Sequence, residues 1–144
     1  MKRIVALTLA IMMTITCCFG TASAAGIGDI GPRASFILSS YNAGLKAGTN
    51  SGELRISYDV TASKLADSIG VSSIVIYKSN GSRVLTVTGT VTNGLIITSD
   101  ASHTGVYTYK GTSGVSYYAE VTVFATVGTV SDSRTVTTST VKAP

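Results

Sequence analysis

The sequence has no tryptophan and very little proline, histidine or cysteine. Its 144 residues include two Pro, two Cys and one His. Both cysteines, Cys17 and Cys18, lie near the N-terminus, so the rest of the chain has no cysteine pair with which to form a disulfide. One histidine without a downstream cysteine leaves no convincing zinc or copper site. We therefore expect neither a metal ion nor an organic cofactor.

The N-terminal residues have the three-part pattern of an export signal. Lys2 and Arg3 precede an apolar run, Ile4–Cys18. Ala22-Ser23-Ala24 then supplies the small side chains that signal peptidase requires. These features predict a signal peptide over residues 1–24, cleavage after Ala24, and a secreted product.

No long apolar run follows this signal. The N-terminal run itself is short for a membrane-spanning helix, so we expect no membrane span. Lipid attachment at Cys17 or Cys18 is the alternative to cleavage after Ala24. Thr16 precedes the first of these cysteines, where lipid attachment usually requires a small residue.

Positive charge is modest and scattered. The formal net charge is +4, and Lys2 and Arg3 of the signal contribute two of these charges. Nucleic-acid binding requires clustered cations, and the sequence contains no basic run or stripe. We therefore expect no nucleic-acid partner, although a polyanion-binding face assembled in three dimensions stays open.

Composition and alternation indicate an all-β domain. Thr, Val, Ile and Tyr favour strands, and segments of alternating polarity recur between turn residues, which is typical of an antiparallel sandwich or barrel. In Glu53–Thr61, the apolar residues from Leu54 to Val60 occupy every second position, so one face is expected to be buried. We expect a flexible lead-in over residues 25–33 and a single domain over residues 34–144. Other strands are expected at Ala34–Tyr41, Val71–Ser79, Arg83–Thr90, Leu95–Thr98, Gly105–Lys110, Val115–Thr126 and Ser131–Val141.

The segments between these strands carry turn and helix signals. Ser63 can cap a short helix that Gly70 ends, with Leu65, Ala66 and Ile69 covering the core. Asn80-Gly81 predicts a hairpin with a type I′ turn. Asn42–Gly52 is expected to be a loop and Ser99–Thr104 a polar turn.

Several segments carry a resemblance to known domains. Tyr77-Lys-Ser-Asn-Gly81, Gly105-Val-Tyr-Thr-Tyr109 and Gly114–Ala125 resemble parts of immunoglobulin-like and fibronectin type III-like sandwiches. The same segments and Ser131-Asp-Ser-Arg-Thr135 are similar to small secreted proteins of Gram-positive gut bacteria that have no assigned function. The resemblance implies an antiparallel sandwich of seven or eight strands with one short helical turn. It also implies a structural tyrosine in the penultimate long strand, for which Tyr117 is the candidate.

Little in the sequence favours catalysis. His103 has Ser102 and Asp100 nearby, but neighbours along one turn rarely form a triad, and a polar turn explains them equally well. Glycosidase chemistry would need two carboxylates flanking a cleft, and carboxylates on exposed strand positions are more often solubilising. We therefore expect no catalytic residues and no enzyme, with a small hydrolase as the least favoured alternative.

Two kinds of binding remain. Outward aromatic side chains on a Ser/Thr-rich sheet suggest a glycan-binding module of a cell surface or host mucus. The last strand, Ser131–Val141, has two similar faces and few charges, which suggests an edge strand able to pair with a copy of itself or another extracellular protein. We favour the second interpretation. The candidate ligand contacts by strand parity are Tyr41, Tyr77, Tyr118 and Phe124.

Overall fold

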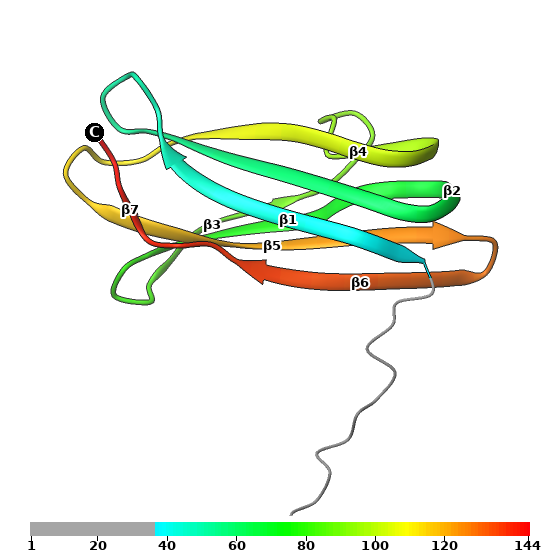
Figure 1. Ribbon diagram of the computed structural model, residues 1–144. Helices are drawn as coiled ribbons and strands as arrows, with labels where there is room; N and C mark the ends of the chain where they lie inside the picture. The colour runs from blue at the N-terminus through cyan, green and yellow to red at the C-terminus, as the bar shows by residue number, and fades with distance from the viewer. Residues whose placement is uncertain (1–36) are drawn as a thin grey trace, which may run out of the picture. The chain divides into compact units, whose positions relative to one another are not determined.

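The computed structural model describes residues 37–144, so the expected signal peptide, Ala24, both cysteines and the lead-in lie outside the described residues. The described chain is all-β, with seven antiparallel strands and no helix, as the sequence predicted in its coarse outline (Figure 1). None of its segments is a helix long and apolar enough to cross a membrane. The strands are β1 (Leu38–Ala47), β2 (Glu53–Lys78), β3 (Arg83–Thr88), β4 (Ile96–Lys110), β5 (Ser116–Val127), β6 (Val130–Thr137) and β7 (Val141–Lys142).

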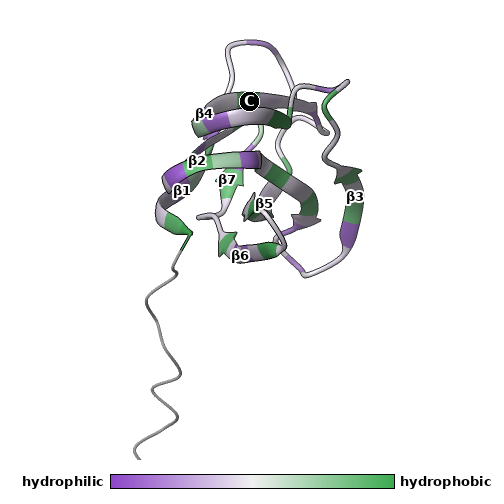
Figure 2. Ribbon diagram, turned by 90° about the vertical axis from the view of Figure 1, so that its right-hand side faces the viewer, coloured by the Kyte–Doolittle hydropathy of each residue, from purple (hydrophilic) through white to green (hydrophobic). Residues whose placement is uncertain are grey.

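Strand β2 joins two layers of the curled sheet. It is 26 residues long, and its first half, Glu53–Thr61, lies between β1 and the second half of β4. Its second half, Ser68–Lys78, pairs with β5 on one side and with β3 and the start of β4 on the other. β6 and β7 then continue the second layer beyond β5. The end-on view shows the strands arranged around a common interior (Figure 2).

The core fills the space between these two layers. Leu54, Ile56 and Val60 of β2 are fully buried, as are Val121 and Val123 of β5. Their polar neighbours in the sequence face outward, and hydrophobic and hydrophilic residues therefore alternate along the ribbons (Figure 2). Burial of these branched side chains from both layers stabilises the fold without a disulfide among the described residues.

The prediction of a short helix at Ser63–Gly70 is wrong, because this segment continues β2. Ser68 and Ile69 pair with β4 on one side and β5 on the other, and a helix would give up both sets of ladder hydrogen bonds. Ile69 is buried as expected, but Leu65 is 66% exposed and covers no part of the core. Tertiary pairing has therefore overridden the local capping signals.

Two segments that were predicted to be a loop and a turn also lie wholly or partly in strands. The polar turn predicted at Ser99–Thr104 lies within β4, which bends at Ser99 with a φ of 55°. The loop predicted at Asn42–Gly52 begins later than expected, because β1 runs to Ala47. Leu45 of this extension is buried and pairs with Ile56 across the ladder, so packing on the core recruits it into the sheet.

The β2–β3 hairpin occurs where the sequence predicted it, with a different turn. Type I′ requires positive φ at both Asn80 and Gly81, and only Gly81 has one, at 84°. Gly81 N donates to Lys78 O, and Lys78 N donates to Ser82 O, each over 2.9 Å. This pattern belongs to a three-residue hairpin in which a left-handed glycine follows an ordinary turn.

The C-terminal strand is interrupted at Thr138, which separates β6 from β7. Thr138 is buried, its N–H donates to Ala119 O over 2.9 Å, and its Oγ1 accepts from Ala119 N over 3.0 Å. On either side of this interruption, β6 and β7 pair with β5 and with no other described strand. β6 is therefore an edge strand, as its composition suggested.

Candidate functional site

Two of the four candidate aromatic residues lie side by side on the outer face of the second layer. Tyr77 of β2 and Tyr118 of β5 are opposite each other in the ladder. Their rings stack with centroids 5.0 Å apart and planes inclined by 11°. Both side chains are half-buried, so they form the aromatic centre of this face.

Charged groups flank this aromatic pair. Tyr77 Oη donates to Glu120 Oε2 over 3.1 Å, and Arg83 of β3 is opposite Tyr77 on its other side. Partial desolvation raises the pKa of Tyr77, and the hydrogen bond and negative charge of Glu120 raise it further. The charge of Arg83 acts in the opposite direction. This face therefore brings Arg83 and Glu120 close to the two stacked phenols.

The stacking limits what the pair can bind. Each ring turns one face toward the other, so only the remaining face and edges of each are available to a ligand. Phe124 lies further along β5, where its cross-strand neighbours are Gly70 and Ser133. Tyr41 is on β1 in the other layer and is 42% exposed. The four candidates therefore do not form one continuous aromatic platform.

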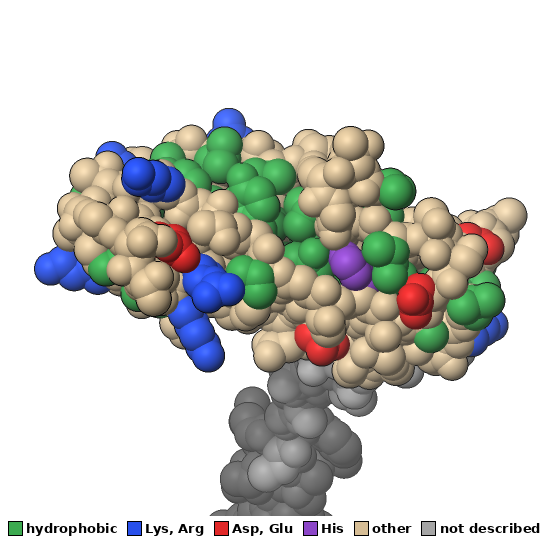
Figure 3. Space-filling model, turned by 90° about the horizontal axis from the view of Figure 1, so that it is seen from above, with side chains coloured by type: hydrophobic (Ala, Val, Ile, Leu, Met, Phe, Trp, Pro, Cys, Tyr) green, Lys and Arg blue, Asp and Glu red, His purple; other side chains and the backbone are tan. Residues whose placement is uncertain are grey.

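A shallow depression of about 220 Å³ lies on the first layer. Lys46 and Arg55 are opposite each other in the β1–β2 ladder and both line it, beside exposed Val106. Like charges in this position repel each other. Figure 3 shows most of the Lys and Arg side chains of the viewed face toward one end, while the histidine lies nearer the other. The lining residues are Lys46, Ala47, Arg55, Ser57 and Val106.

His103 holds a loop and meets no catalytic partner among its described contacts. Its Nε2 is 2.9 Å from Gly94 O and 3.2 Å from the hydroxyl of Tyr58. Tyr58 Oη also donates to Gly94 O over 3.3 Å. Asp100 instead accepts from the backbone N–H of Ala101 and Ser102. The residues that the sequence grouped around His103 are therefore not assembled into a triad.

The described residues also show no group of three His, Cys, Asp or Glu side chains placed to hold a metal ion. Several carboxylates are engaged in local contacts. Glu53 accepts from Asn50, and Asp67 accepts from Gly128 N over 2.6 Å. These contacts stabilise the turns at Asn50 and Gly128.

The free edge of β6 follows from the direction of its hydrogen bonds. Thr138 N donates to Ala119, and the direction of the N–H groups alternates along an antiparallel ladder. Arg134 and Val136 therefore face β5. The intervening residues direct their N–H and C=O groups away from the sheet. These outward residues are Ser131, Ser133, Thr135 and Thr137.

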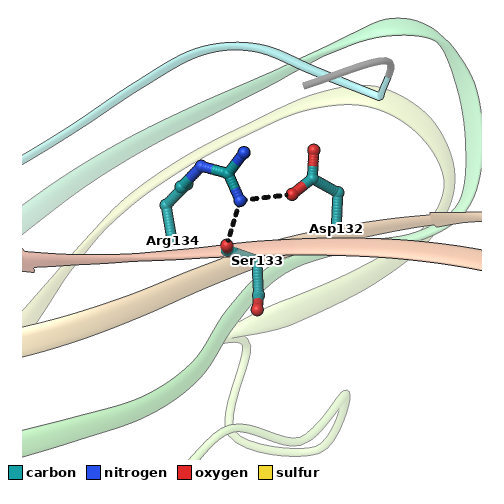
Figure 4. Close-up of polar contacts among 3 residues, drawn as sticks. All are labelled: Asp132, Ser133 and Arg134. Atoms are coloured by element: carbon teal, nitrogen blue, oxygen red, sulfur yellow. Dashed lines mark hydrogen bonds and ion pairs between the residues drawn. The ribbon is translucent and has the colours of Figure 1, made fainter. Parts of the chain in front are cut away.

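An ion pair on β6 is the feature that sequence reasoning missed. Asp132 and Arg134 are opposite buried Ala125 and Val123, so both side chains are on the inner face of the layer. Arg134 Nη1 lies 2.7 Å from Asp132 Oδ1 and donates over 2.7 Å to Ser133 O (Figure 4). Opposite charges two residues apart in a strand share a face, and this spacing could have indicated the pair.

Comparisons of the chain with protein-family models, with curated proteins and with solved structures gave no match. The candidate function therefore depends on the surfaces described above.

Proposed function

We propose that this chain is a secreted, non-catalytic module with an immunoglobulin-like or fibronectin type III-like sandwich. It acts in extracellular protein interaction, including self-association, by accepting a further strand at the edge of β6. The resemblance of its segments to small secreted proteins of Gram-positive gut bacteria and its export-type N-terminus support an extracellular role. His103 contacts Gly94 O and the hydroxyl of Tyr58, which gives it a place in holding the β3–β4 loop.

The observation that carries this proposal is that no described strand pairs with the outer side of β6. Val130–Thr137 pairs with β5 alone, and the outward N–H and C=O groups of Ser131, Ser133 and Thr135 are arranged as a template for another strand. The side chains at these positions are small hydroxyls on the exposed face, so they leave room for a neighbouring strand.

Sedimentation of the purified secreted protein over a range of concentrations tests this proposal. Thr135→Pro removes an outward N–H without removing a hydrogen bond to β5, so it should weaken association more than folding. Thr108→Pro is the matched control, because Thr108 is an exposed threonine at the edge of β4. Thr138 is unsuitable for this purpose, since its buried contacts with Ala119 belong to the fold.

Equal weakening by Thr135→Pro and Thr108→Pro would argue against a role for β6. A wild-type protein that remains monomeric at the highest soluble concentration would contradict the proposed self-association. Strand addition to a foreign protein would then have to be shown by a binding measurement.

Glycan binding is the second candidate, because the fold brings Tyr77 and Tyr118 together beside Glu120. Aromatic rings with adjacent polar groups suit the apolar and hydroxyl faces of a sugar. A mucin-type glycan array probed with wild-type protein and with Tyr118→Ala tests this function. Binding that survives Tyr118→Ala unchanged would exclude this surface as the glycan site.

A further inference from the structure

The charges on β6 select one way in which two copies can pair, and this inference rests on the self-association proposed above. In an antiparallel pair formed through the free edges, outward residues of one copy must be opposite outward residues of the other. The two-fold axis can then pass at or between these residues. Each possible register brings different inward side chains of the two β6 strands together.

Only one central register places opposite charges against each other. With Ser133 opposite Ser133 of the second copy, Asp132 is opposite Arg134 of the second copy, and the reverse pair follows by symmetry. Moving the axis by one residue places Asp132 opposite Asp132, or Arg134 opposite Arg134. Like charges in direct opposition destabilise a strand pair, so both neighbouring registers are disfavoured.

The present contacts of Arg134 are suited to an exchange between copies. The guanidinium bonds Asp132 and the carbonyl of Ser133, and this carbonyl is on the free edge. In the pair, Ser133 O would accept from Ser133 N of the second copy, and Arg134 would move to the opposite Asp132. The side chain of Arg134 is 36% exposed, so it has room for this movement.

The geometry of this register favours the exchange. Residues 132 and 134 form a non-hydrogen-bonded pair in this register, in which opposite Cα atoms lie about 4.5 Å apart and the side chains approach closely. The ion pair between Asp132 and Arg134 within each copy is therefore replaced by an ion pair between the two copies. The inward charges therefore discourage unrelated strands and accept a second copy of this strand.

We propose that two copies associate by antiparallel pairing of β6, with Ser133 at the two-fold axis and reciprocal ion pairs between Asp132 and Arg134. The product is a symmetric dimer in which the second layers of both copies join into one continuous sheet. The sandwich is otherwise unchanged, and the rest of the inner face takes no part in the pairing.

Charge exchange between separately purified variants tests this register by sedimentation. Asp132→Arg and Arg134→Asp should each weaken homodimerisation at least about tenfold, because each places like charges opposite each other. An equimolar mixture of the two should form heterodimers with nearly wild-type affinity, since every opposite pair is then attractive. Arg55→Asp, a charge reversal on β2 away from this edge, is the control and should leave association unchanged.

The variant carrying both Asp132→Arg and Arg134→Asp guards against effects on folding. It keeps an ion pair within the strand, should dimerise with itself, and should not mix with wild-type protein. If wild-type protein associates but the mixed single variants remain as weak as each alone, the register is wrong while strand addition at β6 survives. If wild-type protein is monomeric at every concentration, both this register and the proposed self-association fail.

Discussion

At the scale of single residues, two adjacent tyrosines have opposite roles. Tyr117 is 1% exposed, its Oη accepts from Thr112 N over 2.9 Å, and its ring meets Tyr109 edge-on with centroids 5.7 Å apart. Tyr118 is on the opposite face of β5, half-buried against Tyr77. The pleat of one strand therefore divides the pair into a core residue and a surface residue.

Replacement of each tyrosine by alanine should show this division. Tyr117→Ala removes a large buried side chain and its hydrogen bond, and should lower the free energy of unfolding by about 3 kcal/mol or more. Tyr118→Ala removes only part of a surface stack, and should lower it by about 1 kcal/mol or less. Urea titrations of both variants provide the measurement, and equal losses would contradict the assigned faces.

The Tyr77–Glu120 hydrogen bond should be visible in the titration of Tyr77. Partial desolvation and Glu120 both raise its pKa, so folding favours the neutral phenol. The associated stability is present below the unfolded tyrosine pKa of about 10 and is lost as pH rises through the higher folded value. Glu120→Gln should lower the pKa of Tyr77, measured by carbon NMR of the ring.

Tyr58 is the internal control for this titration. Burial raises the pKa of Tyr58, and Glu120 does not contribute to that shift. The pKa of Tyr58 should therefore be the same in wild-type protein and Glu120→Gln. A pKa of Tyr77 that does not fall in the variant would mean that the hydrogen bond to Glu120 does not persist in solution.

At the scale of elements, one backbone carbonyl of the loop between β3 and β4 contacts side chains of two strands, and Leu95 O and Gly89 N add backbone hydrogen bonds to β2. Gly94 O receives contacts from both His103 and Tyr58, which belong to β4 and β2. Asn93 Oδ1 accepts from the backbone N–H of Thr90 and Leu95, so the loop is also ordered internally. His103 is therefore a structural residue in this arrangement.

His103→Ala should loosen this loop without unfolding the domain. Loss of one hydrogen bond should lower the free energy of unfolding by about 1 kcal/mol, and amide exchange should accelerate at Asn93–Leu95. Thr104→Ala, a change at the exposed neighbour, should do neither. A loss of stability with no change in exchange at the loop would show that His103 acts elsewhere.

The elements also show how far sequence alone could lead. The alternation in Glu53–Thr61 and Val115–Thr126 predicted strands and buried faces, because burial of one face imposes a strict period of two. The predictions of a helix at Ser63–Gly70 and a turn at Ser99–Thr104 were wrong, because capping and turn signals reflect only a few neighbouring residues. Their strand conformation depends on ladder partners distant in the sequence.

The candidate sites were less predictable for a related reason. Parity suggested that Tyr77 and Tyr118 point outward, but their direct opposition depends on the β2–β5 register, which no local pattern specifies. The ion pair on β6 required knowing which face of that strand meets Ala125 and Val123. The sequence alone left those two faces hard to distinguish.

At the scale of the whole molecule, the sheet leaves more than one unpaired edge. Within residues 37–144, β1, β3 and β4 each pair with β2 alone, as β6 pairs with β5 alone. β6 differs because it carries an inward ion pair, Asp132–Arg134. In an antiparallel register, these charges complement the same charges on β6 of a second copy. Because a single strand pair buries little surface, association through it should be weak and concentration-dependent.

Amide hydrogen exchange of β6 at low and high protein concentration tests strand addition most directly. The N–H groups of Ser131, Ser133 and Thr135 point away from β5, so they should exchange rapidly in dilute protein and become protected as concentration rises. Those of Arg134 and Val136, which face β5, should be protected at both concentrations. Outward amides that exchange equally fast at both concentrations, in a protein that sediments as a monomer throughout, would contradict self-association through β6.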